Sequence, residues 1–292
     1  MKIDAYGAPV MVSWQLTKDC NLACLHCCTD SAPGRALPGE LTREEALGLA
    51  GQIIAAKVPY VMLCGGEPTI VPYFWELADV LSRGGTLIKI ETNGQKPFPA
   101  ERLSPEAVRS VQISIDGATQ DTYGKMRPGG ELSLALAACE AVHKAGLPLE
   151  ITFAPTRLNI HEAEAVIALA LGLGAFRFNT GKLMRLGTAA KLWERLECSS
   201  QQYEEYLTLL ELKERELKGR LELCFRPFSV DEDLLERGSQ PSGTLLVLPD
   251  GKVKVTATLP DLCADLKHQT LLEAWQAYRQ AWKDLNNMPV MV

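Results

Sequence analysis

Short runs of apolar residues alternate with longer amphipathic stretches along the first 180 residues of the chain. The short runs predict strands, and several of them end at glycine, asparagine or aspartate. The longer stretches carry apolar residues at helical spacing, and one begins with a capping box of Thr42 and Glu45. The expected strands span 10–16, 60–64, 86–91, 111–115, 149–153 and 175–178, and the expected helices span 41–57, 71–83, 132–144 and 161–171.

A strand followed by a helix, repeated six times, predicts a parallel sheet with right-handed crossovers. Six units are too few for a closed eight-unit barrel, so we expect an α/β fold that is either an open partial barrel or a doubly wound sheet. In both folds the chemistry lies at the carboxyl ends of the strands. The unusual residues follow the strands at those ends: a cysteine-rich loop, Gly65-Gly66-Glu67-Pro68, Thr92-Asn93-Gly94 and Ser114-Ile115-Asp116-Gly117.

The last third of the chain has a different pattern. A charged amphipathic helix is expected over 201–218, and strands over 244–248 and 252–256 flank a Pro-Asp-Gly turn that predicts a hairpin. Four large side chains then recur at spacings of three and four and predict a helix facing the core: Leu271, Trp275, Tyr278 and Trp282. We therefore expect a barrel domain over 1–195 and a small α+β extension over 196–292.

Composition narrows the class of protein. The chain has 292 residues, of which 47% are apolar and 23% charged, so it can bury a core without disulfides. Its net charge of −6 argues against nucleic acid as the main partner. The apolar stretch over 165–176 is too short for the roughly 18–20 residues that cross a bilayer. The N-terminus lacks the apolar core of a signal peptide, so we expect a cytoplasmic protein without membrane partners.

Cysteine spacing is the most informative signal. There are nine cysteines, an odd number, and four of them fall between Cys20 and Cys28, which indicates metal binding rather than disulfides. Cys20, Cys24 and Cys27 on one loop could ligate three irons of a [4Fe–4S] cluster and leave the fourth open to a small molecule. Zinc is the competing metal, but adjacent Cys27 and Cys28 suit a tetrahedral site poorly. Redox-active or structural thiols are the remaining alternative.

The Gly65-Gly66-Glu67-Pro68 segment has a physical rationale of its own. Paired glycines let the backbone approach a ligand closely, and Glu67 can accept hydrogen bonds from an ammonium group. A strand that ends at two glycines is also common without any function. We therefore interpret this segment as a ligand-binding one because it occurs together with the cysteine loop.

The cysteine spacing, together with GGEP, TNG and SIDG in that order, resembles the radical S-adenosylmethionine (SAM) superfamily over residues 10–180. The resemblance implies a partial (βα)6 TIM-like barrel. It also implies that SAM binds the open iron of a [4Fe–4S] cluster and is cleaved to a 5′-deoxyadenosyl radical, which abstracts a substrate hydrogen.

By that resemblance, Cys20, Cys24 and Cys27 ligate the cluster, and Gly65, Gly66, Glu67 and Pro68 hold the methionine amine. His26 stands where an aromatic residue packs near adenine, Ser114 contacts the ribose, and Asp116 lies near the substrate. Thr92 and Asn93 are further cofactor-binding candidates, and Arg127 aligns with an arginine that grips the methionine carboxylate. Two asparagines that follow later strands, Asn159 and Asn179, are candidate pocket residues. Cys28 is read as a small loop residue and Cys64 as a buried apolar one.

The C-terminal third resembles the SPASM/twitch subgroup, whose members carry auxiliary iron–sulfur clusters there. This chain departs from that signature, because Thr256 stands where Gly-x4-Cys requires a cysteine and only Cys224 and Cys263 lie beyond residue 200. We therefore expect no auxiliary cluster, which favours redox-neutral outcomes such as epimerisation, rearrangement or fragmentation. Cys224 or Cys263 could then donate a hydrogen atom, although a structural role is the more common one for a cysteine in such a position.

The substrate class stays open between peptides and small molecules, including natural-product precursors, sugars, nucleosides and tetrapyrroles. The expected partners are an electron donor such as flavodoxin or ferredoxin and, for a peptide, a separate leader-peptide-binding protein, because the barrel starts by residue 10. The alternatives are oxidative modification with an unrecognised auxiliary cluster, a non-catalytic iron–sulfur or SAM-binding protein, and a zinc-binding interaction module.

Overall fold

The computed structural model describes residues 3–226, 229, 232 and 242–287. Its strands are β1 Met11–Gln15, β2 Tyr60–Cys64, β3 Leu87–Thr92, β4 Val108–Ser114, β5 Leu149–Thr152, β6 Arg177–Gly181, β7 Glu222–Arg226, β8 Thr244–Val247, β9 Lys252–Lys254 and β10 Leu262–Asp265. They form one sheet in the order β10-β9-β8-β1-β2-β3-β4-β5-β6-β7. Pairing is parallel from β8 through β1 to β7, and antiparallel at β8–β9 and β9–β10.

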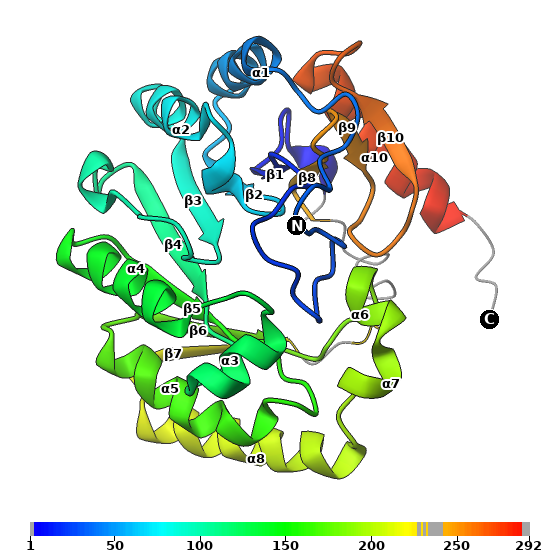
Figure 1. The fold of residues 1–292 in the computed structure, drawn as a ribbon. Coiled ribbons are helices and arrows are strands. Elements are labelled where there is room, and N and C mark those ends of the chain that lie inside the picture. The colour runs from blue at the N-terminus through cyan, green and yellow to red at the C-terminus, as the bar shows by residue number, and fades with distance from the viewer. Residues whose placement is uncertain (1–2, 227–228, 230–231, 233–241, 288–292) are drawn as a thin grey trace.

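Helices cover the outer side of the curved sheet, and the cysteine loop lies on its inner side (Figure 1). The α-helices are α1 Arg43–Ala55, α2 Phe74–Arg83, α3 Gln120–Met126, α4 Leu132–Lys144, α5 Ala163–Gly172, α6 Gly187–Lys191, α7 Trp193–Leu196, α8 Ser200–Glu216 and α10 Leu271–Asn287. Short 3-10 turns span Ile3–Ala5, Pro68–Ile70, Ala100–Arg102 and Ile160–Glu162. None of the helices among the described residues is both long and apolar enough to cross a membrane.

Local signals explain where the helices begin. The side chain of Thr42 accepts from the N–H of Glu45, and the side chain of Glu45 accepts from the N–H of Thr42, so the predicted capping box starts α1. The buried face of α1, which includes Ala46, Leu49 and Ile53, then packs into the core between helices and sheet. Burial of such a face supplies most of the stability of a helix this short.

Alternation along the strands separates the two faces of the sheet. In β3, for example, Ile88 and Ile90 are fully buried toward the helices, whereas Lys89 and Glu91 are partly exposed on the opposite, inner face. The apolar core therefore lies between sheet and helices, and the inner face of the barrel is polar where chemistry is expected.

The fold class is confirmed as α/β, and the parallel run is longer than the six predicted strands. Two strands in the last third were missed: β7 pairs with β6, and β10 pairs with β9. β7 lies at one end of the strand order and is only partly buried along its length, so it lacks the apolar run that reveals an inner strand. Three short helices, α3, α6 and α7, were also missed, since each has seven residues or fewer.

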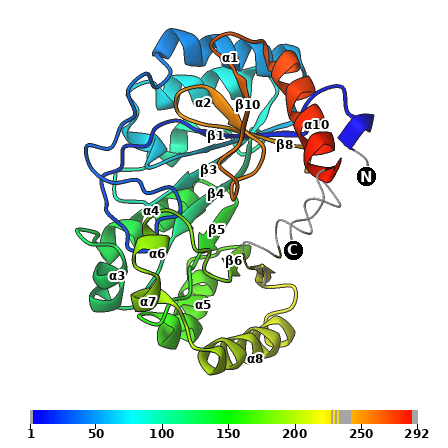
Figure 2. The same cartoon turned by 90° about the vertical axis from the view of Figure 1, so that its right-hand side faces the viewer.

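The last third joins the same sheet from both sides. β8 pairs with β1, the predicted hairpin forms between β8 and β9, and α10 lies beside the N-terminal segment (Figure 2). The predicted aromatic stripe is confirmed as core, because Leu271, Trp275, Tyr278 and Trp282 are all at most 3% exposed. The division at residue 195 stays a prediction, and strands from both sides of it share one sheet.

Candidate functional site

Four segments that carry the unusual residues meet at the carboxyl ends of adjacent strands. The cysteine loop follows β1, Gly65 follows β2, Thr92 ends β3, and Asp116 lies two residues after β4. Because β1, β2, β3 and β4 are neighbours in the sheet, segments far apart in sequence are brought side by side. This is the arrangement that the sequence predicted.

The cysteine loop crosses directly over the two glycines. The N–H of Gly66 donates to the carbonyl oxygen of Thr17 at 2.7 Å, and the N–H of Glu67 donates to that of Asp19 at 3.0 Å. A Cβ atom on Gly66 would lie 1.9 Å from the carbonyl oxygen of Asp19, so no larger residue fits there. The glycine thus serves a backbone–backbone approach, in addition to any approach of a ligand.

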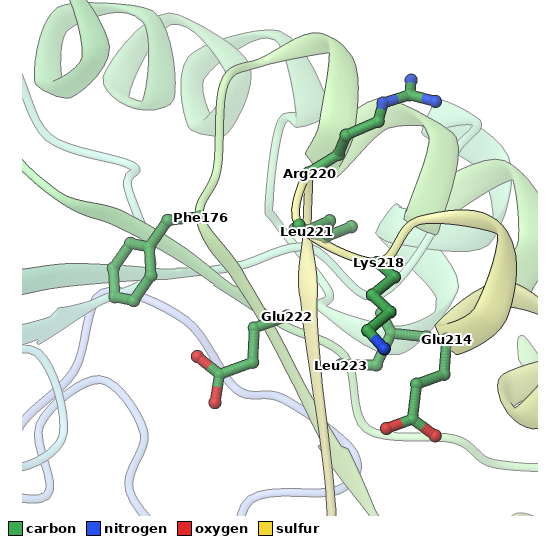
Figure 3. A pocket seen from close by; sticks show the side chains of 8 residues that line it. Phe176, Glu214, Lys218, Arg220, Leu221, Glu222 and Leu223 are labelled. Carbon is green, nitrogen blue, oxygen red and sulfur yellow. The ribbon is translucent and has the colours of Figure 1, made fainter.

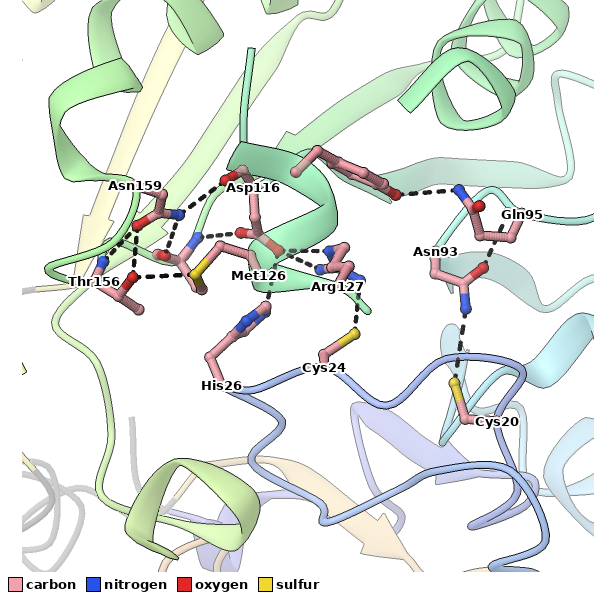
Figure 4. Close-up of polar contacts among 12 residues, drawn as sticks. Cys20, Cys24, His26, Asn93, Gln95, Asp116, Met126, Arg127, Thr156 and Asn159 are labelled. Carbon is pink, nitrogen blue, oxygen red and sulfur yellow. Dashed lines mark hydrogen bonds and ion pairs between the residues drawn. The ribbon is translucent and has the colours of Figure 1, made fainter. Parts of the chain in front are cut away.

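Each of the three predicted ligand thiols has a hydrogen-bond partner, and Figure 4 shows those of Cys20 and Cys24. Asn93 Nδ2 donates to Cys20 Sγ at 3.7 Å, and Arg127 Nη1 donates to Cys24 Sγ at 3.5 Å. Cys27 Sγ shares a hydrogen bond with Thr29 Oγ1 at 3.2 Å and accepts one from a backbone N–H at 3.3 Å. Such donors favour thiolates and are typical of iron–sulfur ligands.

Burial keeps the thiols of Cys20 and Cys24 protonated when no cation is bound. Burial, with smaller contributions from the nearby Glu67, Cys24 and Cys27, raises the pKa of Cys20 to about 12. Burial also raises the pKa of Cys24 above its ordinary value, and Arg127 opposes that effect. A bound metal would supply the positive charge that ionises the thiols, so cluster binding and deprotonation are coupled here.

Glu67 joins two of the loops. Its Oε1 accepts from the hydroxyls of Thr69 at 2.6 Å and Thr92 at 2.7 Å, and its Oε2 accepts from the N–H of Asn93 at 2.8 Å. The residue is fully buried, and this burial raises the pKa of its carboxyl against the hydrogen bonds that favour the charged form. Pro68 begins the following 3-10 turn. Glu67 thus links the GGEP segment to Thr92 and Asn93 of TNG, and its carboxylate is already bonded to protein donors.

Asp116 lies at the centre of a buried ion pair. Its Oδ2 is 2.6 Å from both Nε and Nη2 of Arg127 and 3.1 Å from Nε2 of His26, and its Oδ1 accepts from the N–H of Ala154 (Figure 4). Burial works to raise the pKa of the carboxyl, but Arg127 and His26 outweigh it and hold that pKa well below its ordinary value. Asn159 donates to the backbone carbonyl of Asp116 at 3.0 Å and is a structural partner of this turn.

A short helix that the sequence did not predict braces the cysteine loop. The N–H of Thr188 donates to the carbonyl oxygen of Cys27 at 2.8 Å, and its hydroxyl donates to Asp30 at 2.9 Å. Lys191 Nζ also lies 2.7 Å from Asp30. In the sequence, the glycine at position 187 is the one local sign of this turn. In the structure Gly187 has a φ of 54°, which is unfavourable for other residues.

The inner face of the barrel collects polar side chains in rows set by strand register. Pairing aligns Ser114 with Thr152, Thr152 with Asn179, and Asn179 with Cys224. Ser114, the predicted ribose contact, and Cys224, a predicted hydrogen-atom donor, therefore lie in one row. Cys224 had been singled out from sequence without the strand that carries it.

The described contacts of Cys263 do not place its thiol on the inner face of the barrel. Cys263 lies on β10, at the other end of the strand order from Cys224, and its thiol donates to the backbone carbonyl of Val253 at 3.5 Å while packing against the apolar core. Cys28 is exposed beside the ligand loop, and Cys64 is buried as predicted. Of the two candidate donors, the geometry favours Cys224.

Two cavities lie outside the cysteine loop. One of about 370 Å³ sits between the start of β6 and the start of β7, lined by Phe176, Glu222 and the turn at 218–221 (Figure 3). It is at the amino ends of the strands, where barrels of this type place no chemistry. A second of about 260 Å³ lies past the carboxyl ends of β5 and β6, between Pro155, Lys182 and Tyr203. Only the second is on the side of the site.

The ligand geometry bears on which metal fits. The thiols of Cys20, Cys24 and Cys27 lie on one loop and each has a hydrogen-bond donor, and three ligands are one fewer than a closed structural zinc site takes. A [4Fe–4S] cluster takes each thiolate on a different iron, and soft thiolates with hydrogen-bond donors suit it. The residues present therefore fit a cluster better than zinc.

Comparison with known proteins agrees with the site. The model of the radical SAM superfamily matches residues 14–170. The chain belongs to the radical SAM superfamily. Enzymes of this superfamily use a [4Fe–4S] cluster and SAM, so this protein is an enzyme with those two cofactors.

Curated relatives include maturases and haem synthases. Mycofactocin maturase MftC of Mycobacterium ulcerans is 36% identical over 216 residues, which cover 73% of this chain and 58% of that protein. AdoMet-dependent heme synthase of Methanosarcina barkeri is 28% identical over 296 residues, covering 92% of this chain and 83% of that protein. The chain thus spans little more than half the length of the maturase.

Solved structures with the same fold bind SAM. Streptococcus suis SuiB bound to S-adenosylmethionine has a TM-score of 0.78 at 11% identity, covering 98% of this chain and 69% of SuiB. Native anSMEcpe with bound AdoMet has a TM-score of 0.69 at 16% identity, covering 96% of this chain and 84% of its own. At such identities the likeness shows the fold alone.

Proposed function

We propose that this enzyme modifies a peptide by hydrogen abstraction and that Cys20, Cys24 and Cys27 hold its cluster. The observation that carries the ligand assignment is the donor to each of the three thiols, beside the GGEP loop. When bound, the cluster and SAM supply a 5′-deoxyadenosyl radical that abstracts a hydrogen atom. The chain's own residues orient these cofactors through Glu67, Asn93 and Arg127.

Two observations support a peptide substrate. The relatives include maturation proteins, among them sporulation killing factor maturation protein SkfB of Bacillus subtilis, 30% identical over 198 residues and covering 67% of this chain and 47% of that protein. The inner face from β3 to β7 is also balanced in charge, with Lys89, Arg177 and Arg226 against Glu91, Glu150 and Glu222. A tetrapyrrole with several carboxylates would need a surplus of positive charge.

Cys224 is proposed as the hydrogen-atom donor of a redox-neutral epimerisation. It shares the inner-face row of Asn179, Thr152 and Ser114. In the proposed step, the Cα–H bond of one residue breaks on one face, and the Cys224 S–H bond breaks to form a new Cα–H bond on the other. The resulting thiyl takes up one electron from an external donor of the flavodoxin or ferredoxin class and one proton from water.

We propose a redox-neutral outcome because the cysteine count predicts that this chain holds no auxiliary cluster. The chain holds two cysteines beyond residue 200, Cys224 and Cys263, and they lie on strands at opposite ends of the strand order. Two thiols so placed are too few for a second cluster. We therefore propose that this chain is a member of the SPASM/twitch subgroup whose C-terminal part does not carry the ligands of an auxiliary cluster.

The test uses anaerobically reconstituted protein, SAM, dithionite and a set of synthetic peptides of varied sequence. We expect 5′-deoxyadenosine together with one solvent deuterium at a peptide Cα when the reaction runs in D2O. Cys224→Ala should still form 5′-deoxyadenosine but incorporate no deuterium, whereas Cys263→Ala should behave as the parent. Normal turnover by Cys224→Ala would refute the donor assignment.

Haem-type chemistry is the second candidate, because the Methanosarcina barkeri synthase is the relative whose length is matched most fully among those named here. A porphyrin tetracarboxylate is the probe for it. Oxidised porphyrin product with 5′-deoxyadenosine, and no reaction of the peptides, would replace the peptide proposal.

A further inference from the structure

Each of the three nitrogens of the Arg127 guanidinium already has a protein partner. Nε and Nη2 both point to Asp116 Oδ2 at 2.6 Å, and Nη1 points to Cys24 Sγ at 3.5 Å. Arg127 follows α3 as its C-cap, and its backbone N–H donates to Tyr123 at 2.8 Å. Both the main chain and the side chain of this arginine are therefore held in place.

The pair is withdrawn from solvent. The side chains of Arg127 and Asp116 are 9% and 1% exposed. The remaining contacts of Asp116, to His26 Nε2 and to the N–H of Ala154, fix the carboxylate from the other side. A ligand carboxylate that bound the Nε and Nη2 side of Arg127 would have to displace Asp116, a buried charged partner, which is costly.

We propose that Arg127 is a positioning residue that raises the reduction potential of the cluster through its hydrogen bond to Cys24, and that Asp116 holds it there. This role replaces the carboxylate grip that the family resemblance implies for Arg127 and the substrate contact implied for Asp116. It rests on the proposed assignment of Cys24 as a cluster ligand.

Elementary electrostatics sets the sign of the effect. Reduction adds negative charge to a cluster that is already bound by anionic thiolates. A positively charged donor on one thiolate stabilises the reduced form more than the oxidised form, so it raises the potential. Because both groups are buried, water screens this interaction little.

The experiment is an EPR-monitored redox titration of reconstituted protein without SAM, with iron content measured on the same samples. Arg127→Gln removes the charge, and the double variant Arg127→Gln/Asp116→Asn removes both members of the pair and leaves its net charge unchanged. Arg127→Lys keeps a positive charge but loses the planar guanidinium that donates to Asp116 and Cys24 together. Arg35→Gln is the matched control, because Arg35 also neighbours the cysteine loop but is 49% exposed and paired with Asp30.

We expect full iron content and a more negative potential in Arg127→Gln. The double variant should shift in the same direction but less, because it also removes the opposing charge of Asp116, whose effect on Cys24 is smaller than that of Arg127. The expected size in Arg127→Gln is at least a tenfold fall in the ratio of reduced to oxidised cluster at fixed ambient potential, or about 59 mV for one electron. Arg127→Lys should fall between Arg127→Gln and the parent, and Arg35→Gln should match the parent. If Arg127→Gln loses iron but the double variant does not, the cause is the unpaired carboxylate of Asp116. The potential of the double variant then decides the proposal.

Two results would overturn the proposal. One is an unchanged potential in the double variant, with or without a loss of SAM affinity; a loss of affinity alone would restore the carboxylate grip. The other is failure of every Arg127 variant to assemble a cluster while Arg35→Gln does, which would make Arg127 an assembly residue. A shifted potential in an enzyme that never cleaves SAM would sink the proposed function and leave this inference standing.

Discussion

The backbone N–H of Thr188 donates to the carbonyl oxygen of Cys27 at 2.8 Å, although 161 residues separate them in sequence. The contact begins at Gly187, where a Cβ would lie 2.5 Å from the carbonyl oxygens of both Cys27 and Cys28. The helix that follows β6 is thus pressed against the main chain of the ligand loop. This relationship makes the cysteine loop sensitive to residues that carry no ligand.

Gly187→Ala should therefore weaken cluster retention. Gly85→Ala is the matched control, because both glycines have positive φ, 54° and 83°, but Gly85 has nothing within 4 Å of its Cβ position. Both variants pay about 1–2 kcal/mol for the left-handed backbone. Only Gly187→Ala should also lose iron faster to a chelator, followed by absorbance. Equal rates in the two variants would show that the contact does not brace the loop.

Cys24→Ala should not assemble the cluster, whereas Cys28→Ala should assemble it normally. Cys28 is the control because it lies in the same loop, is exposed and is not an assigned ligand. Iron and sulfide per chain after anaerobic reconstitution measure the outcome. About four irons in the parent would fit one cluster, whose three protein thiolates leave one iron open. A full cluster in Cys24→Ala would overturn the ligand assignment.

Glu67→Gln should weaken SAM binding without changing iron content. The new amide would face the donors of Thr92 and Asn93, and a buried unsatisfied donor costs about 1–3 kcal/mol. The effect would reach SAM through the position of the two loops, since the carboxylate itself is fully buried. Equilibrium dialysis with SAM measures it. Glu76→Gln, an exposed residue of α2 that pairs with Arg43, should bind SAM as the parent does. Unchanged affinity in Glu67→Gln would remove Glu67 from the site.

Asp116→Asn should lower the free energy of unfolding in a pH-dependent way. The folded-state pKa of Asp116 is depressed below its ordinary value of 3.8, so its contribution is present above that value and is lost as pH falls. The gap between parent and variant, about 3–5 kcal/mol for one broken buried pair, should thus narrow when urea unfolding of the metal-free chain is repeated below pH 3.8.

The control for that experiment is Asp121→Asn, whose carboxylate is exposed and contacts Lys125 on the surface of α3. Surface pairs of this kind contribute little. A gap for Asp116→Asn that stayed constant with pH would mean that the variant acts through packing rather than through the charge.

The sequence by itself determined the parallel α/β fold, the order of motifs at the strand ends and the cysteine set. These features have local causes: periodicity sets the element type, and close spacing places three thiols on one loop whatever surrounds it. The capping box of α1 and the core stripe of α10 were predictable for the same reason.

Only the tertiary structure decided which groups act on that loop. Arg127 is 103 residues from Cys24, and Asn93 is 73 residues from Cys20, yet each donates to its thiol. Strand β7, which places Cys224 on the inner face, forms by pairing with β6 and has little local signal. Such contacts depend on how the sheet aligns its strands, and no short stretch of sequence encodes that alignment.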